Sequence, residues 1–139
     1  MKKILLPCLA VMAIFYSCHK DNTTPCVTSM ASVAGTYKLT SLRFKPSGGN
    51  ESDIIASLPT CRRDDLHVLN ANGSYNYQDA GTICSPNGSF AGDWALSGTT
   101  VTLEGEVYTL QSFDCTTLVV YKNNYPSAGD KTTSIFTRQ

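Results

Sequence analysis

The residue types in this chain that could do chemistry are few, and cysteine is the most frequent of them. The sequence holds six cysteines but only two histidines, His19 and His67. Zinc and catalytic centres usually combine several histidines, cysteines or acids at characteristic spacings. No two cysteines here have the C-x₂-C spacing of a zinc site. The sequence therefore predicts no metal site, and disulfide bonds are the expected main role of the cysteines.

Four cysteines lie in the body of the chain: Cys26, Cys61, Cys84 and Cys115. An even number in an exported domain is typical of disulfide bonds, and four cysteines allow three pairings. We favour Cys61–Cys84, because both lie in turn-rich segments that flank one predicted hairpin. On the chain-entropy model this bridge would contribute about 3 kcal/mol. Cys26–Cys115 would then join the N-terminal segment to the body of the domain.

The remaining potential sites have simpler interpretations. Asn70-Ala71-Asn72-Gly73-Ser74 resembles part of a calcium loop but lacks the first acid, so a hairpin turn explains it better. The charge cluster of residues 62–65 (Arg-Arg-Asp-Asp) could bind an anion, but we interpret it as a solvated turn with local ion pairs. His67 has no nucleophile motif beside it, and G-x-S-x-G, H-E-x-x-H and P-loop patterns are missing from the sequence. We expect no catalytic residue, no enzyme activity and no cofactor.

The N-terminus has the pattern of a targeting signal. Two lysines precede an uncharged run over residues 4–16, which is followed by Ser17-Cys18. A membrane-spanning helix needs about 20 apolar residues, so the run is too short and predicts a signal peptide over residues 1–17. The residues before Cys18 resemble a relaxed bacterial lipoprotein signal, which implies that Cys18 is lipidated and becomes the first residue. Ordinary secretion, with Cys18 paired to another thiol, is the alternative.

Lipidation would place the protein at a membrane. Several acyl chains, palmitate among them, anchor a protein more stably than one chain does. Residues 18–33 are polar and rich in Ser and Thr, which indicates a flexible tether. We therefore expect an outer-membrane lipid-anchored protein that faces the periplasm or the cell surface.

Length and charge limit the class of protein. A chain of 139 residues favours one folded domain, here residues 34–139. Lysine and arginine number 11 and acids also 11, so the basic footprint of a nucleic-acid binder is missing. With 42% hydrophobic and 16% charged residues, the chain is not a disordered charged tail. A monomer is compatible with these values.

The elements that must position these residues are short strands. Apolar residues alternate with polar ones and are interrupted by Gly and Asn turns, which is typical of β-hairpins. We expect strands at 35–45, 65–70, 74–79, 90–97, 100–104, 106–113, 117–122 and 132–138. The alternation changes phase near Thr40-Ser41, which predicts a β-bulge in the first strand. Residues 53–58 could form one helical turn. Closely spaced hairpins favour an all-β fold, an antiparallel up-and-down barrel with at most one short helix.

Two segments resemble each other and a known family. Residues 35–41 and 92–98 both read Gly-x-aromatic-x-Leu-hydroxyl. Together with Cys61, Cys84 and the Asn-Gly turn, they make residues 34–138 similar to the lipocalin-like domain of small exported Gram-negative lipoproteins. The resemblance implies an eight-stranded antiparallel barrel, which is wide enough either to be filled by side chains or to hold one small ligand. It implies no established activity.

Our leading hypothesis is a barrel that binds a small, partly apolar ligand. The residues expected to line or fill its interior are Tyr37, Leu39, Tyr75, Tyr77, Phe90, Trp94, Leu96, Tyr108 and Leu110. The alternative is a binding or inhibitor module of the cell envelope that acts through loops at its rim, around residues 48–49, 62–63 and 123–126. A purely structural envelope protein is the third possibility.

Overall fold

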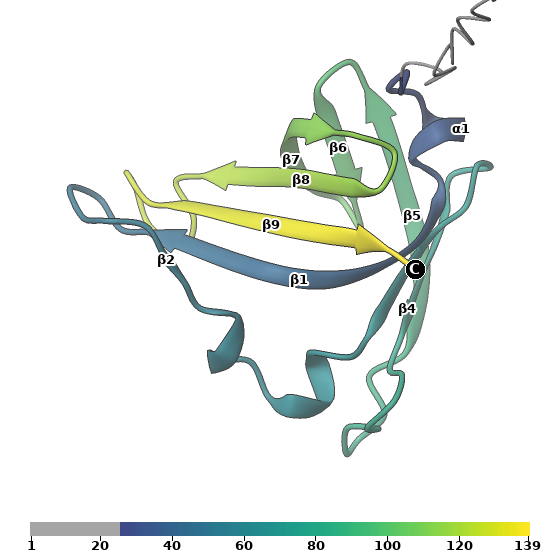
Figure 1. Cartoon of the computed structure of the whole chain (residues 1–139), viewed down its shortest axis with the longest axis horizontal. Helices are drawn as coiled ribbons and strands as arrows, with labels where there is room; N and C mark the ends of the chain where they lie inside the picture. Colours follow the sequence, from purple (N-terminus) through teal and green to yellow (C-terminus); the bar gives the residue numbers. More distant parts are fainter. Residues whose placement is uncertain (1–25) are drawn as a thin grey trace, which may run out of the picture.

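The computed structural model describes residues 26–139 (Figure 1). The expected signal peptide, the lipidated Cys18 and most of the expected tether lie outside the described residues. Within residues 26–139, no helix is both long and apolar enough to cross a membrane.

The described chain folds as one antiparallel sheet that closes on itself. Consecutive strands from β3 to β9 pair with each other, as hairpins joined by short turns require. The strands are β1 Gly35–Lys45, β2 Ser52–Asp53, β3 Leu66–Leu69, β4 Ser74–Gln78, β5 Phe90–Ser97, β6 Thr100–Leu103, β7 Glu106–Phe113, β8 Thr117–Asn123 and β9 Lys131–Arg138. The predicted all-β antiparallel barrel is confirmed, and each of the eight expected strands has a counterpart.

The first and last strands close the ring. β1 pairs with β9 along nearly its whole length, from Tyr37 opposite Arg138 to Lys45 opposite Lys131. The register shifts between Leu39 and Ser41, which leaves Thr40 unpaired. This shift is the predicted β-bulge, and it keeps apolar side chains on the inner face of a bent strand. Figure 1 shows β1, β9 and β8 side by side across the centre of the molecule.

A ninth strand was not expected. β2 has two residues and pairs Ser52 with Phe44 and Asp53 with Arg43, at the end of β1 that β3 does not reach. The Asp53 carboxylate fixes this segment by accepting from the Ser41 hydroxyl at 2.7 Å and the Ile55 amide at 2.8 Å. The helical turn expected at residues 53–58 is a 3₁₀ turn, Ile55–Ser57, and a second one follows at Thr60–Arg62.

The structure departs from the predicted tether at its C-terminal end. Residues 30–33 form a short helix, α1 Met30–Val33, which begins after a capping box made by Ser29 and Ser32. Val33 is fully buried, and its carbonyl accepts a hydrogen bond from the Tyr37 hydroxyl at 2.7 Å. The folded part therefore begins before residue 34, because α1 packs against one end of the barrel.

The two ends of the barrel differ. We call the end next to α1 the helix end; it also carries the turns 70–73 and 114–116. The opposite end, which we call the loop end, carries the longer connections 46–51, 54–65, 79–89 and 124–130.

Each end of the barrel has one disulfide bond. Cys26–Cys115 joins the segment before α1 to the β7–β8 turn at the helix end. Cys61–Cys84 joins two connections at the loop end. Both expected pairings are confirmed.

The core occupies the interior next to the helix end. Its buried side chains are Val33, Tyr37, Leu69, Tyr75, Trp94, Val101, Leu118 and Val120. The indole N–H of Trp94 donates to the Asn70 carbonyl at 2.8 Å, so the turn that follows β3 is held against the core.

Candidate functional site

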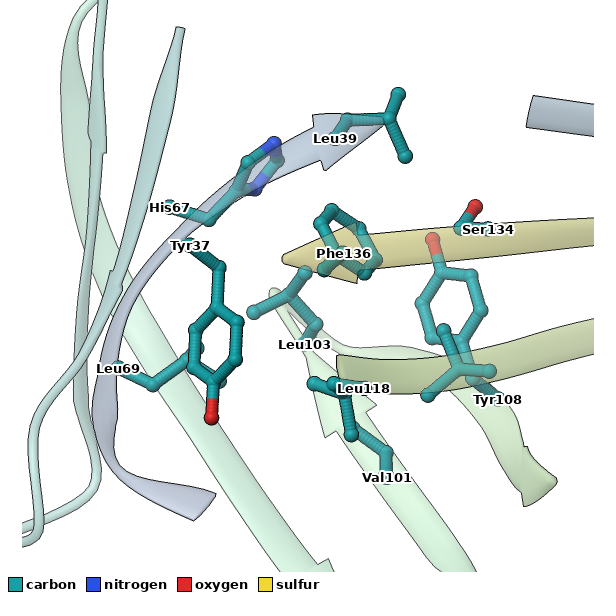
Figure 2. Close-up of a pocket in the computed structure, with 11 residues that line it drawn as sticks. Tyr37, Leu39, His67, Leu69, Val101, Leu103, Tyr108, Leu118, Ser134 and Phe136 are labelled. Carbon is teal, nitrogen blue, oxygen red and sulfur yellow. The ribbon is translucent and has the colours of Figure 1, made fainter. Parts of the chain in front are cut away.

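The candidate site is a cavity of about 210 Å³ inside the barrel (Figure 2). Six strands contribute to its wall: β1, β3, β6, β7, β8 and β9. Most of the wall is aliphatic or aromatic, and its apolar members are Leu39, Leu69, Val101, Leu103, Leu118, Val120 and Phe136. Alternation places these side chains here, because residues two apart on a strand share a face of the sheet.

Four lining residues carry polar atoms: Tyr37, His67, Tyr108 and Ser134. The Tyr37 hydroxyl is already used, because it donates to the Val33 carbonyl of α1 and accepts from Arg138 at 2.7 Å. In Figure 2 this hydroxyl points away from His67. An apolar wall with a few polar groups is the usual form of a small-molecule site.

His67 is held by aromatic neighbours on the cavity wall. Its Nδ1 lies 2.8 Å from the Tyr75 hydroxyl. Its ring forms T-shaped pairs with the rings of Tyr77 and Phe136, at centroid distances of 5.2 and 4.9 Å. Burial lowers the pKa of His67 to about 4, although the nearby Asp65 carboxylate acts in the opposite direction. His67 is therefore neutral near pH 7 and presents a polar but uncharged group.

The size of the cavity defines the size of the molecule that it can hold. An apolar cavity of about 150 Å³ in another protein stays dry and binds benzene. A cavity of about 210 Å³ exceeds that volume and fits a single aromatic ring with a short substituent. It is smaller than the roughly 300–1,000 Å³ of sites for drug-sized ligands.

A charged group stands beside the cavity toward the loop end. Lys122 follows Val120 by two residues on β8, so its side chain leaves the same face of the strand. Its ammonium forms an ion pair with Glu106 and lies 4.5 Å from the ring centroid of Tyr125 and 5.9 Å from that of Tyr108. The Lys122 side chain is 25% exposed and that of Glu106 is 58% exposed. The Glu106 hydrogen bond raises the pKa of Lys122, which keeps it charged.

A second pocket of about 200 Å³ lies at the loop end and is more polar. It is lined by Arg62, Asp65, Tyr77, Asp79, Cys84, Pro86, Gly88 and Phe90. Its two buried carboxylates already have internal donors. Asp79 accepts from the amides of Cys84 and Gly88, and Asp65 accepts from the Tyr77 hydroxyl and the Ala80 amide. These hydrogen bonds hold the 79–89 connection in place. We therefore regard this pocket as part of the structure of that connection rather than as the main candidate site.

The nine side chains expected to line or fill the interior are divided among three environments. Tyr37, Leu39 and Tyr108 line the main cavity, whereas Tyr77 and Phe90 line the loop-end pocket. Tyr75 and Trp94 are buried in the core, and Leu96 and Leu110 pack against it. Apart from Phe90, which is 48% exposed, these residues form or support the interior.

Most of the cavity wall is not among the residues that the sequence predicts. From the sequence His67 has no expected catalytic role, and Ser134 and Phe136 on β9 are not among the expected lining residues. The alternation of the last strand was visible, but two neighbouring positions cannot be assigned to inside or outside without the curvature of the sheet.

The cluster at residues 62–65 is not the solvated turn with local ion pairs that the sequence suggested. Asp65 is 3% exposed, and Asp64 accepts from the Thr82 amide at 2.8 Å. Arg63 donates to the Thr60 hydroxyl at 2.8 Å. The two acids bind amides of the 79–89 connection instead of the neighbouring arginines, because that connection lies next to them through Cys61–Cys84.

The Asn-Gly segment is the expected hairpin turn. The Asn72 side chain accepts from the Ser74 amide at 3.0 Å, and Gly73 has φ +88°, which glycine adopts without strain. Within residues 26–139, no group of three or more His, Cys, Asp or Glu side chains could hold a metal ion.

Comparisons of this chain with protein-family models, with curated proteins and with solved structures found no match.

Proposed function

We propose that this protein is a lipocalin-like barrel that binds a small, mainly apolar molecule in its interior. The observation that carries the proposal is the cavity of about 210 Å³ with a mainly apolar wall. Burial of an apolar molecule contributes roughly 25 cal/mol for each Å² removed from water. His67, Tyr108 and Ser134 supply the few polar groups that would orient the ligand.

We also propose that the barrel is attached to the outer membrane by a lipid on Cys18. The support is the sequence around Cys18 and the two disulfides, which are typical of an oxidising compartment. Metabolic labelling with an alkyne analogue of palmitate tests this part. We expect label on the wild-type protein and none on Cys18→Ser; label retained by Cys18→Ser would contradict the proposal.

The test of ligand binding is calorimetric titration of the purified full-length protein with indole, a neutral molecule of one fused ring system. Val120→Phe adds volume at a buried position of the cavity wall, whereas the adjacent Val119 is not part of the wall. We expect indole to bind wild type and Val119→Phe, and Val120→Phe to weaken binding at least tenfold. Equal binding to the two variants, or none to wild type, would contradict the proposal.

A rim-binding module is the second candidate, because the three expected rim segments lie at one end of the barrel. Residues 48–49, 62–63 and 124–126 belong to loop-end connections, and residue 123 ends β8 beside them. Tyr125 is 49% exposed there, and aromatic side chains are common anchors of protein interfaces. A pull-down from envelope extract with Tyr125→Ser as control tests this candidate. Recovery of the same proteins by both forms would contradict it.

A further inference from the structure

The cation beside the cavity indicates the chemical class of the ligand. We infer that the cavity takes a small amphipathic carboxylic acid, with its apolar part inside the barrel and its carboxylate at the Lys122 ammonium. This inference rests on the proposed function, because it needs the cavity as a binding site.

The Lys122 side chain lies on the inner face of β8. Leu118 and Val120 line the cavity, and Lys122 is the next residue on that face of β8. An advance of two residues along a strand is about 7 Å, so the ammonium lies within reach of a group on a short chain. A lysine on the outer face would point into water, whereas this one shares the inner face with the cavity wall.

The ammonium of Lys122 lies next to aromatic rings. Its Nζ is near the rings of Tyr108 and Tyr125, and its side chain is three-quarters covered. Tyr108 itself lines the cavity, so the cation and the apolar wall share a side chain. A ligand whose apolar part fills the cavity can therefore bring an anionic group to this cation.

The present partner of Lys122 can leave. The Glu106 side chain is 58% exposed, so its carboxylate can return to water when a ligand carboxylate arrives. Other acids near the loop end are occupied: Glu104 accepts from the Asp93 amide at 2.7 Å, and Asp65 and Asp79 have the internal donors described above. Lys122 can therefore exchange one carboxylate for another without leaving a buried charge unpaired.

The test compares acids with their neutral amides in the purified full-length protein by calorimetry. The probes are phenylacetate, 3-phenylpropanoate and 4-phenylbutanoate, each with the corresponding primary amide. We expect one acid of the series to bind about tenfold more tightly than its amide. This preference should shrink as salt is added, because salt screens the ion pair.

Three variants and one control variant locate the effect. Lys122→Gln should reduce binding of the acid to that of the amide and leave the amide unchanged, while Lys122→Arg should keep the preference. Glu106→Gln removes the competing carboxylate and should strengthen binding of the acid severalfold. Lys131→Gln is the matched control, because the Lys131 ammonium also lies over a tyrosine ring, Tyr121 at 4.2 Å, but on a face away from the cavity. Thermal melting of each variant checks that it is folded.

The outcomes separate the inference from the proposed function. If the amides bind and the acids bind no better, or if Glu106→Gln weakens the acid, the cavity is a binding site but the inference is wrong. If Lys122→Gln and Lys131→Gln reduce the preference equally, the inference is also wrong. If neither acids nor amides bind to wild type, the proposed function and the inference both fail.

Discussion

The guanidinium of Arg138, at the end of the last strand, lies over the ring of Tyr37 in the first strand and donates to its hydroxyl at 2.7 Å. The same Nη2 atom donates to the carbonyls of Ser32 and Ala34, at 2.5 and 3.1 Å. One side chain thus joins β9, β1 and the end of α1. Since Tyr37 also lines the cavity, this contact forms the base of the site at the helix end.

We predict that Arg138→Met lowers the free energy of unfolding by about 2–4 kcal/mol, because it leaves two carbonyls without their charged donor. Tyr37→Phe should cost about 1–2 kcal/mol. The double variant should lose less than the sum of the two, because the variants remove a shared interaction. Urea denaturation of all four proteins measures this coupling.

Arg138→Lys is the control for charge. A lysine keeps the charge but lacks the planar fork, so we expect an intermediate loss. Strict additivity of the Arg138 and Tyr37 variants would show that the contact contributes nothing specific.

We predict that His67 makes the fold less stable in mild acid. An unfolded histidine has a pKa of 6.5, whereas burial lowers that of folded His67 to about 4, so the unfolded chain binds the proton more readily. The stabilisation is complete above pH 6.5 and is lost as the pH falls from 6.5 to about 4. The loss should reach up to about 3 kcal/mol.

Urea denaturation at several pH values between 7 and 4 measures this dependence. His67→Gln should flatten the curve in that window, whereas His19→Gln, which removes the chain's other histidine, should not. A curve of equal slope in wild type and His67→Gln would mean that His67 is not responsible.

We predict different contributions from the two disulfides. Cys26–Cys115 joins residues 89 positions apart and Cys61–Cys84 residues 23 apart. The longer loop loses more entropy in the unfolded state, so the chain-entropy model gives about 4–5 and about 3 kcal/mol respectively. Paired Cys→Ala variants, compared by denaturation with the oxidised protein, test the order. A larger loss from the Cys61–Cys84 pair would point to local effects at the loop end instead.

We predict that Gly92→Ala is destabilising by about 1 kcal/mol, although alanine normally suits a strand better than glycine. A Cβ at Gly92 would lie 1.3 Å from Glu104 Oε1, so the Glu104 side chain would have to move and give up its bond to the Asp93 amide. In a Glu104→Ala background the same change should be neutral or stabilising. Thermal melting of the four proteins decides; a cost that persists in that background would contradict the explanation.

The strands were predictable because alternation and turn residues are dense in this sequence. Asn72-Gly73 marks one hairpin, and the phase change near Thr40 marks the bulge. β2 was not predictable, because Ser52 and Asp53 are polar and pair with β1 for only two residues. Its position is determined by hydrogen bonds to the Asp53 carboxylate.

The cavity wall was harder to predict because hydrophobicity does not identify the inner face of β3. Leu66 and Val68 are more apolar than His67, yet His67 lines the cavity and its two neighbours do not. The Tyr75 hydroxyl forms a hydrogen bond with the imidazole and so compensates for the burial of a polar ring. That partner belongs to the next strand, and only the register of the folded sheet brings it to His67.

Pairing of β1 with β9 also determines when the interior can exist during synthesis. Of the strands within residues 26–139, β1 is the first to emerge and its partner is the last, so the ring stays open until β9 has been made. Pairing of residues so distant in sequence is slow, because loop entropy must be lost before contacts form. A chain shortened at its C-terminus would lack this closure, so the sheet would remain open at β1.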